Sequence, residues 1–179
     1  MDCLTIHLGI KFAMIFYKTT ILILGVKMAQ KRSVLVVDDE LGPRESLRMI
    51  LKPIYDVHTA ANGQEALQFI NREKIDLVTL DLKMPGIPGL DVLREIKKHQ
   101  EDIEVIVITG YGTLANAMEA IRCGAVDFIS KPFNVADIVA VISRSFERRN
   151  LKEKVKNLGQ KIKESLTTED ICKEDSSTH

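Results

Sequence analysis

The sequence predicts an α/β protein with a doubly wound, five-stranded parallel sheet and five helices. The first observation is a set of short apolar runs, most of which lack the alternation of a half-exposed strand and are typical of strands covered on both faces. The second is that stretches with apolar residues at helical spacing separate these runs, which indicates βαβ units. The third is that acidic, hydroxyl or lysine residues directly follow several of the runs. The predicted strands are 33–37, 55–60, 77–80, 105–108 and 126–129.

Each predicted helix presents apolar residues to the sheet at intervals of three or four. Pro43 can open the first helix, Asn62-Gly63 forms the turn before the second, and Gly124 caps the fourth. The inward-facing residues are Leu47, Ile50 and Leu51 in the first helix, Ala66, Leu67 and Ile70 in the second, Leu90, Leu93 and Ile96 in the third, Ala117 and Ile121 in the fourth (114–123), and Ile138, Val141 and Ile142 in the fifth, which begins near Val135.

Composition indicates one domain with short appendages. The 179 residues are 45% apolar, which is enough for a core. Lys+Arg and Asp+Glu both number 25, so the whole chain has no net charge that would attract nucleic acid. Three widely separated cysteines, Cys3, Cys123 and Cys172, suit a reducing compartment and have no metal-ligand spacing. We therefore expect a cytoplasmic protein without a zinc site.

Residues 1–27 differ in composition from the rest of the chain. They are apolar, but Lys11 and Lys18 interrupt them, so no uninterrupted run approaches the ~18 apolar residues of a spanning helix. They also lack the small-residue cleavage site of a secretory signal. We interpret them as a translated leader upstream of a start at Met28, and we do not expect membrane attachment. A membrane-associating segment and an extra packed element are the alternatives.

The main domain is predicted to span residues 28–148, and the last helix then continues into residues 149–179. Leu151, Val155, Leu158 and Ile162 follow at spacings of 4, 3 and 4, which is the pattern of a short coiled coil. Two heptads are marginal alone. We therefore expect a solvated helical extension that ends in a disordered tail, with a homodimeric coil as the alternative.

Chemically distinctive side chains follow four of the predicted strands, and in a doubly wound sheet these strand ends meet in one crevice. Acidic residues repel one another there unless a cation bridges them, and all-oxygen ligation suits Mg²⁺. A lysine could bind an anionic oxygen beside them. The set therefore predicts a phosphoryl site with Asp81 as the nucleophile. Its members are Asp38, Asp39 and Glu40 after the first strand, Asp81 after the third, Thr109 after the fourth and Lys131 after the fifth.

Each of these residues alone has an ordinary structural explanation. Asp38 or Asp39 could cap a helix, Thr109 could belong to a turn, and Lys131 could be a solvated charge. Two phosphoryl-transfer classes also fit poorly. A haloacid-dehalogenase phosphatase needs a second Asp two residues after its nucleophile, where Lys83 stands, and no phosphate-loop motif occurs.

Four motifs, in this order, closely resemble the receiver domains of two-component response regulators over about residues 32–148. They are Val-Leu-Val-Val-Asp38-Asp39-Glu40, Leu-Asp81-Leu-Lys-Met-Pro-Gly, Val-Ile-Thr109-Gly-Tyr-Gly and Phe128-Ile-Ser-Lys131-Pro132-Phe133. The resemblance implies a flavodoxin-like sheet with strand order 2-1-3-4-5. The text from Gly110 to Thr113 is similar to receivers of the nitrogen-regulation type, which normally precede an ATPase and a DNA-binding domain.

The resemblance also implies a role for each site residue. Asp81 would accept a phosphoryl group from a sensor histidine kinase, and Asp38, Asp39, Asp81 and the Lys83 backbone carbonyl would hold Mg²⁺. Lys131 would contact the phosphoryl group, and its peptide bond to Pro132 would be cis. Thr109 and Phe128 would form the switch that responds to phosphorylation.

We expect a phosphoacceptor that signals through protein–protein contacts and not an enzyme that turns over an outside substrate. One alternative is a phosphorelay intermediate that passes the phosphoryl group to a histidine phosphotransfer protein. Another is a truncated regulator that has lost its transcriptional output domain. Direct nucleic-acid binding would rest only on the basic segment 148–163, so we do not expect it.

Overall fold

Strands and helices alternate along the chain, as the sequence predicts. The computed structural model describes residues 31–110 and 112–174. Residues 1–27, for which a leader is predicted, lie outside this part. The elements are β1 (Ser33–Val37), α2 (Leu41–Leu51), β2 (Asp56–Ala60), α3 (Gly63–Arg72), β3 (Leu77–Leu80), α4 (Gly89–His99), β4 (Glu104–Thr109), α5 (Leu114–Arg122), β5 (Asp127–Ser130) and α6 (Val135–Glu174).

The five strands form one parallel sheet in the order β2-β1-β3-β4-β5. Leu35 of β1 lies between His58 of β2 and Val78 of β3, which fixes the register at the centre of the sheet. This confirms the doubly wound fold class, and it confirms the strand order 2-1-3-4-5 that the family resemblance implies.

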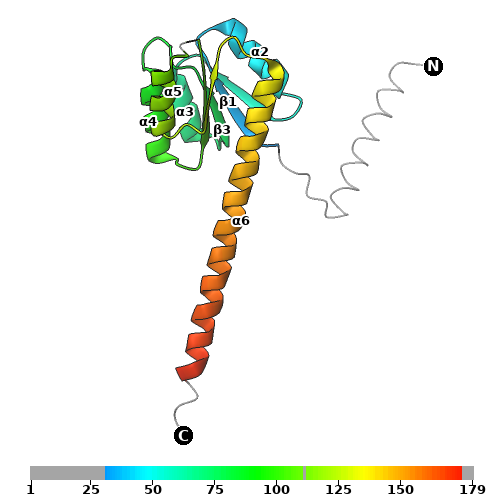
Figure 1. Ribbon diagram of the computed structural model, residues 1–179, viewed down its shortest axis with the longest axis vertical. Coiled ribbons are helices and arrows are strands. Elements are labelled where there is room, and N and C mark those ends of the chain that lie inside the picture. Colours follow the sequence, from blue (N-terminus) through cyan, green and yellow to red (C-terminus); the bar gives the residue numbers. More distant parts are fainter. Residues whose placement is uncertain (1–30, 111, 175–179) are drawn as a thin grey trace, which may run out of the picture. The chain divides into compact units, whose positions relative to one another are not determined.

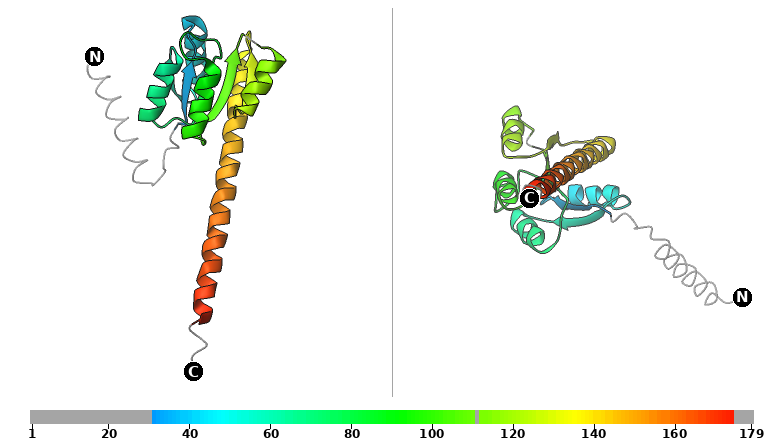
Figure 2. Two further views of the ribbon diagram at one scale, coloured as in Figure 1. Left: turned by 90° about the vertical axis from the view of Figure 1, so that its left-hand side faces the viewer. Right: turned by 90° about the horizontal axis from the view of Figure 1, so that it is seen from below.

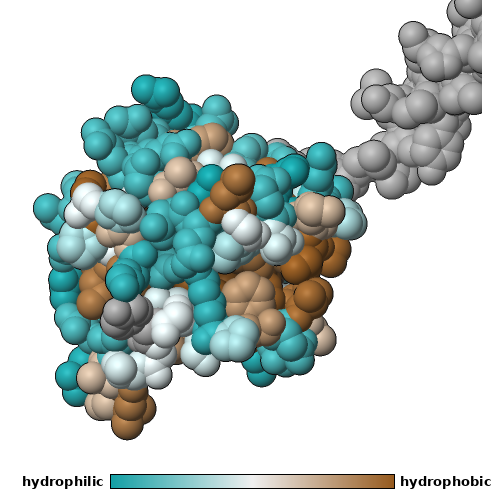
Figure 3. Space-filling model, turned by 90° about the horizontal axis from the view of Figure 1, so that it is seen from above, coloured by the Kyte–Doolittle hydropathy of each residue, from teal (hydrophilic) through white to brown (hydrophobic). Residues whose placement is uncertain are grey.

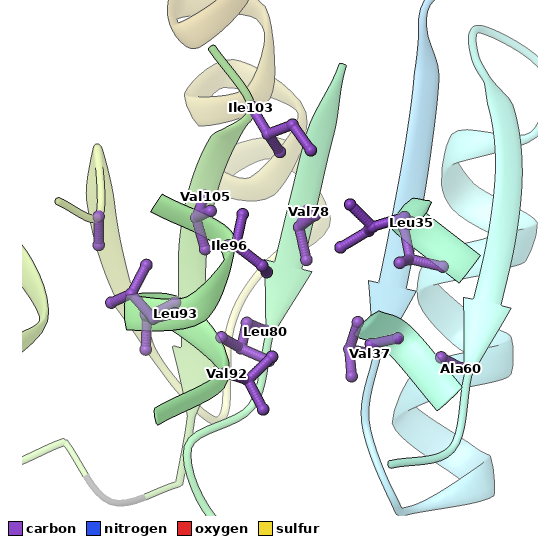
Figure 4. Packing of buried hydrophobic residues seen from close by; sticks show 14 of the residues in the cluster. Leu35, Val37, Ala60, Val78, Leu80, Val92, Leu93, Ile96, Ile103 and Val105 are labelled. Atoms are coloured by element: carbon purple, nitrogen blue, oxygen red, sulfur yellow. The ribbon is translucent and has the colours of Figure 1, made fainter. Parts of the chain in front are cut away.

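Helices cover both faces of the sheet (Figures 1 and 2). Side chains of α2 and α6 share one apolar cluster with β1 and β4, while α3, α4 and α5 pack on the opposite face. Figure 4 shows Val92, Leu93 and Ile96 of α4 directed toward Val78, Leu80 and Val105 of the sheet. Because helices cover both faces, a ligand can reach the sheet at the ends of its strands.

The helix α6 has a packed part and an exposed part. Ile138, Ile142 and Phe146 are buried against the sheet. Every described side chain from Asn150 to Lys163 is exposed, although the backbone stays helical to Glu174. The sequence predicted a disordered end for this segment. That prediction named no residue at which the helix would end, and residues 175–179 lie outside the described part. The boundaries 28–148 and 149–179 stay a prediction.

Two local predictions were wrong. The first helix begins at Leu41, and Pro43 lies within its first turn, where its missing N–H costs no hydrogen bond. The fourth helix was expected to bury Ala117 and Ile121, but Ala120 is its buried residue and Ile121 is exposed. The helix buries a small side chain, which lets it lie close to the sheet.

Among the residues that the structure describes, no helix is both long enough and apolar enough to cross a membrane. This finding concerns residues 31–110 and 112–174 and does not extend to residues 1–27.

Candidate functional site

We call the side of the sheet at which its parallel strands end the carboxyl edge. Its central feature is a lysine held between two buried aspartates. The Lys131 ammonium donates to Asp38 Oδ2 at 2.7 Å and to Asp81 Oδ2 at 2.5 Å. Asp38 and Asp81 are 3% and 4% exposed, so both carboxylates are almost fully withdrawn from solvent. These three residues follow β1, β3 and β5, and the parallel sheet therefore brings together side chains up to 93 positions apart.

The backbone holds the remaining oxygen of each buried carboxylate. Asp81 Oδ1 accepts from the Lys83 N–H at 2.9 Å, and Asp38 Oδ1 accepts from the Glu40 N–H at 2.9 Å. Arg44 of α2 also donates to the Asp38 backbone carbonyl at 2.5 Å. The two carboxylates are thus oriented by neighbouring groups before any ligand arrives, which is the arrangement that reactive groups require.

A third carboxylate completes the cluster. One oxygen from each of Asp38, Asp39 and Asp81 lies within 4.8 Å of the other two, and Asp39 is the most exposed of the three. Carboxylate oxygens are the hard ligands that Mg²⁺ prefers, usually together with water and a phosphate. The donor set fits that ion, and the more exposed position of Asp39 leaves an open side for it.

A pocket of about 580 Å³ opens at this cluster. Hydrophilic side chains occupy much of the face on which the carboxyl edge lies, seen from above in Figure 3. The pocket gives a small anionic ligand access to Asp81, although the side chain itself is buried. Its lining residues are Asp39, Glu40, Asp81, Lys83, Met84, Pro85, Thr109, Gly110 and Lys131.

Electrostatics keeps Lys131 charged. Burial lowers the pKa of its ammonium group, but the hydrogen bonds and charges of Asp38 and Asp81 outweigh that effect, so the pKa lies above its ordinary value of 10.5. Three carboxylates nevertheless face one ammonium group. The site keeps an excess of negative charge that a divalent cation would neutralise.

Gly89, at the start of α4, lies against the backbone of Asp81 and Leu82. A Cβ at this position would lie 2.3 Å from the Asp81 carbonyl oxygen and 2.6 Å from Leu82 Cα. The Gly89 N–H also donates to the Leu82 carbonyl at 3.1 Å. The close approach of α4 to the Asp81 loop therefore depends on the absence of a side chain.

The structure brings together the residues that the sequence singled out. Asp38, Asp39, Asp81 and Lys131 form the cluster, Thr109 lines the same pocket and is fully buried, and the Lys131–Pro132 bond is cis as expected. Phe128 lies outside the pocket, partly buried against the α4 side of the core. The Lys83 N–H donates to Asp81 Oδ1, and the role of the Lys83 backbone carbonyl as a Mg²⁺ ligand stays a prediction.

Sequence reasoning missed two residues. Arg44 falls in the first predicted helix, and nothing in its spacing indicated a contact with the Asp38 backbone. Gly89 follows Pro88, and such a pair predicts only a loop. The close approach of α4 to the Asp81 backbone depends on packing, and the sequence carries no local signal for it.

Comparison with known proteins identifies the family. Residues 34–143 match the family model described as the response regulator receiver domain. The chain belongs to this family. It is therefore a receiver domain of two-component signalling systems, as the sequence motifs indicated.

Curated relatives agree with this assignment. The chain is 40% identical over 106 residues to sporulation initiation phosphotransferase F of Bacillus subtilis, covering 59% of this chain and 86% of that protein. It is 32% identical over 152 residues to the regulatory protein AtoC of Escherichia coli (79% of this chain) and 37% identical over 132 residues to the putative response regulator NtrX-like of Rickettsia conorii (72% of this chain). It spans only 33% and 28% of the length of those two regulators.

Solved structures agree as well. A CheY-like receiver domain protein from Methanospirillum hungatei matches with a TM-score of 0.67 and 29% identity, over 69% of this chain and 99% of that one. NtrX from Brucella abortus, solved in complex with ADP, matches with a TM-score of 0.68 and 38% identity, over 72% of this chain and 30% of that one.

Proposed function

We propose that Asp81 accepts a phosphoryl group from a phosphohistidine of a sensor kinase, and that the phosphorylated receiver signals through protein–protein contacts. The observation that carries this proposal is the Lys131 ammonium bridging the buried carboxylates of Asp38 and Asp81 at the base of an open pocket. Family membership supports it, because receiver domains are phosphoacceptors.

In the proposed step an Asp81 carboxylate oxygen attacks phosphorus. The new P–O bond forms while the P–N bond to the donor imidazole breaks, and the leaving nitrogen takes one proton. The product is an acyl phosphate. The Lys83 N–H holds Asp81 Oδ1, and the Lys131 ammonium, already 2.5 Å from Oδ2, is placed to bind an oxygen of the incoming group as a point charge.

Mg²⁺ would be held by Asp38, Asp39, Asp81 and the Lys83 backbone carbonyl. When bound, it would supply positive charge that lowers the repulsion between the carboxylates and the phosphoryl oxygens. The three-carboxylate cluster supports this assignment.

Phosphorylation would act by a population shift. Thr109 lines the pocket at the end of β4, and Phe128 of β5 lies beside Val107 in the register of the sheet. A phosphoryl group that binds the Thr109 hydroxyl and Lys131 better in one arrangement would favour that arrangement and the position of α5 that goes with it. We propose no turnover of an outside substrate, and we place the protein in the cytoplasm with its kinase partner.

A phosphorelay intermediate is the second candidate function. The similarity to sporulation initiation phosphotransferase F favours it, since that relative is matched over 86% of its length. The receiver part of a transcriptional regulator is the remaining alternative, since the chain matches AtoC and the NtrX-like protein over a third of their length or less.

The test is phosphorylation of the purified chain by acetyl phosphate with Mg²⁺, followed by intact mass measurement. We expect one added phosphoryl group, which is absent in Asp81→Asn and after chelation of Mg²⁺. Asp91→Asn, on the exposed surface of α4, is the matched control and should retain the adduct. An adduct that persists in Asp81→Asn would contradict the proposal. Transfer of the label to a histidine phosphotransfer protein would favour the relay.

A further inference from the structure

The exposed part of α6 carries one continuous apolar stripe. Four large apolar side chains recur at spacings of 4, 3 and 4, and we call them the α6 seam. A lone helix gains nothing from apolar groups that stay in water, so a stripe of this kind marks a contact surface. The left view of Figure 2 shows α6 extending beyond the sheet. The seam residues and their exposures are Leu151 at 62%, Val155 at 71%, Leu158 at 61% and Ile162 at 54%.

The residue types along the seam indicate what covers it. In heptad notation the β-branched residues Val155 and Ile162 occupy the a positions, and Leu151 and Leu158 occupy the d positions. β-branched residues at a with leucine at d favour a parallel two-stranded coiled coil. We propose that the α6 seam binds the same seam of a second copy of this chain in a parallel coiled coil. This proposal does not depend on phosphorylation of Asp81.

The flanking charges favour the same orientation. Glu147 is a g position and Lys152 is the e position five residues later, so a parallel dimer places Glu147 of each chain opposite Lys152 of the second copy. In an antiparallel dimer with the same apolar contacts, Lys154 of one chain lies opposite Lys161 of the second copy. The parallel pairing gains two opposite-charge contacts and avoids this repulsion.

The packed part of α6 removes the usual obstacle to so short a coil. An isolated two-heptad helix must first nucleate, which is unfavourable. Here Ile138, Ile142 and Phe146 are buried against the sheet, and Arg149 donates to the Asp76 carbonyl at 2.9 Å. The helix is therefore already formed where the seam begins.

A surface groove of about 660 Å³ marks the start of the seam. Leu151 and Val155 line it together with the long side chains of Arg148, Lys152 and Lys156. Such a depression between successive turns can accept an apolar knob from a second helix, as coiled-coil packing requires.

The first test measures the mass of the 179-residue chain by sedimentation equilibrium. We expect a reversible dimer, and a dissociation constant raised at least tenfold in the double variant Val155→Lys/Leu158→Lys. The control Asn157→Lys/Gln160→Lys adds the same charges on the outer face and should dimerise more tightly than the seam variant. Circular dichroism of both variants would show whether the helix is retained. A monomer at high protein concentration, or equal weakening by both variants, would overturn the proposal.

The second test decides the orientation by disulfide formation. In a background with Cys3, Cys123 and Cys172 changed to Ser, Leu151→Cys and Ile162→Cys are oxidised separately and as a mixture. A parallel coil places each new cysteine opposite itself, so each variant forms its own linked dimer. An antiparallel coil would give linked dimers only in the mixture, through residues 151 and 162, and that result would overturn the proposal.

Discussion

Strand β3 has a buried aspartate at each end, and the two differ in what surrounds them. Asp76 precedes the strand and Asp81 follows it, with exposures of 8% and 4%. Each contacts a basic side chain from the last third of the chain, Arg149 and Lys131 respectively. Burial and an ionic partner are therefore common to the carboxyl edge and to the amino edge, the side of the sheet at which its strands begin.

The difference lies in the balance of charge and in access. The buried Asp76 pairs one to one with Arg149, with 3.4 Å between Oδ1 and the guanidinium, while the exposed Glu153 contacts Arg149 from the solvent side, and Asp76 Oδ2 accepts from the Ser33 N–H at 2.9 Å. Asp81 shares Lys131 with Asp38, lies beside Asp39, and opens to a pocket. A buried pair that is balanced and closed connects parts of the fold. An unbalanced and accessible cluster has charge left to bind a ligand.

The largest expected effect separates the two aspartates by stability. Asp76→Ala removes the acceptor of the Ser33 N–H and the buried carboxylate beside Arg149, which keeps only the exposed Glu153 and the backbone carbonyl of residue 76 as acceptors among its described contacts. Removing one partner of a buried ion pair costs about 3–5 kcal/mol, and the slight exposure of both side chains points to about 3 kcal/mol here. Asp81→Asn relieves repulsion with Asp38. It should lower the free energy of unfolding by less than about 1 kcal/mol, or raise it.

Urea unfolding of both variants beside the unchanged protein measures this contrast. The assay with acetyl phosphate should show the reverse order, with the adduct kept in Asp76→Ala and lost in Asp81→Asn. Equal destabilisation by the two substitutions would mean that the carboxyl edge is a structural clamp of the same kind as the amino edge.

The next effect concerns the backbone beneath Asp81. In Gly89→Ala the new methyl group meets the Asp81 carbonyl oxygen and Leu82 Cα, so α4 or the loop must shift. We expect a loss of about 2 kcal/mol, typical of overpacking, together with slower phosphorylation. Gly42→Ala is the matched control, because nothing lies within 4 Å of its Cβ in α2. It should raise stability by about 0.5–1 kcal/mol.

A normal phosphorylation rate in a destabilised Gly89→Ala protein would show that the contact supports the fold but does not position Asp81. Asp76 and Asp81 would then differ through the charges around them and not through the backbone that carries them.

The residues of the carboxyl edge could be predicted from the sequence because each is marked by its immediate neighbours in the chain. Asp38, Asp81 and Lys131 each directly follow a buried run, and the rule that parallel strands end at one edge brings them together without any knowledge of side-chain packing. The predicted cluster, the pocket and the fold class all follow from that rule.

The amino edge could not be predicted in this way. Asp76 and Arg149 are 73 positions apart, and Arg149 lies in a basic helical segment where nothing distinguishes it from its neighbours. The inward face of α5 failed for a related reason. Its larger apolar residues, such as Ile121, predicted one buried face. In the structure the small Ala120 is buried against the sheet and Ile121 is exposed. Such choices depend on the shape of the partner surface.

The smallest effect is a pH dependence that should differ between the two basic partners. The pKa of Lys131 is raised in the folded protein, so its contribution to stability is fully present below the ordinary value of 10.5 and is lost as the pH rises through the higher folded-state pKa. The difference in unfolding free energy between the unchanged protein and Lys131→Met should therefore shrink from about pH 10 to about pH 12. The corresponding difference for Arg149→Met should stay constant, because arginine keeps its charge throughout this range. A constant difference for Lys131→Met would mean that the ammonium contributes through packing of its stem, and that the excess of carboxylates at this edge is neutralised by other groups.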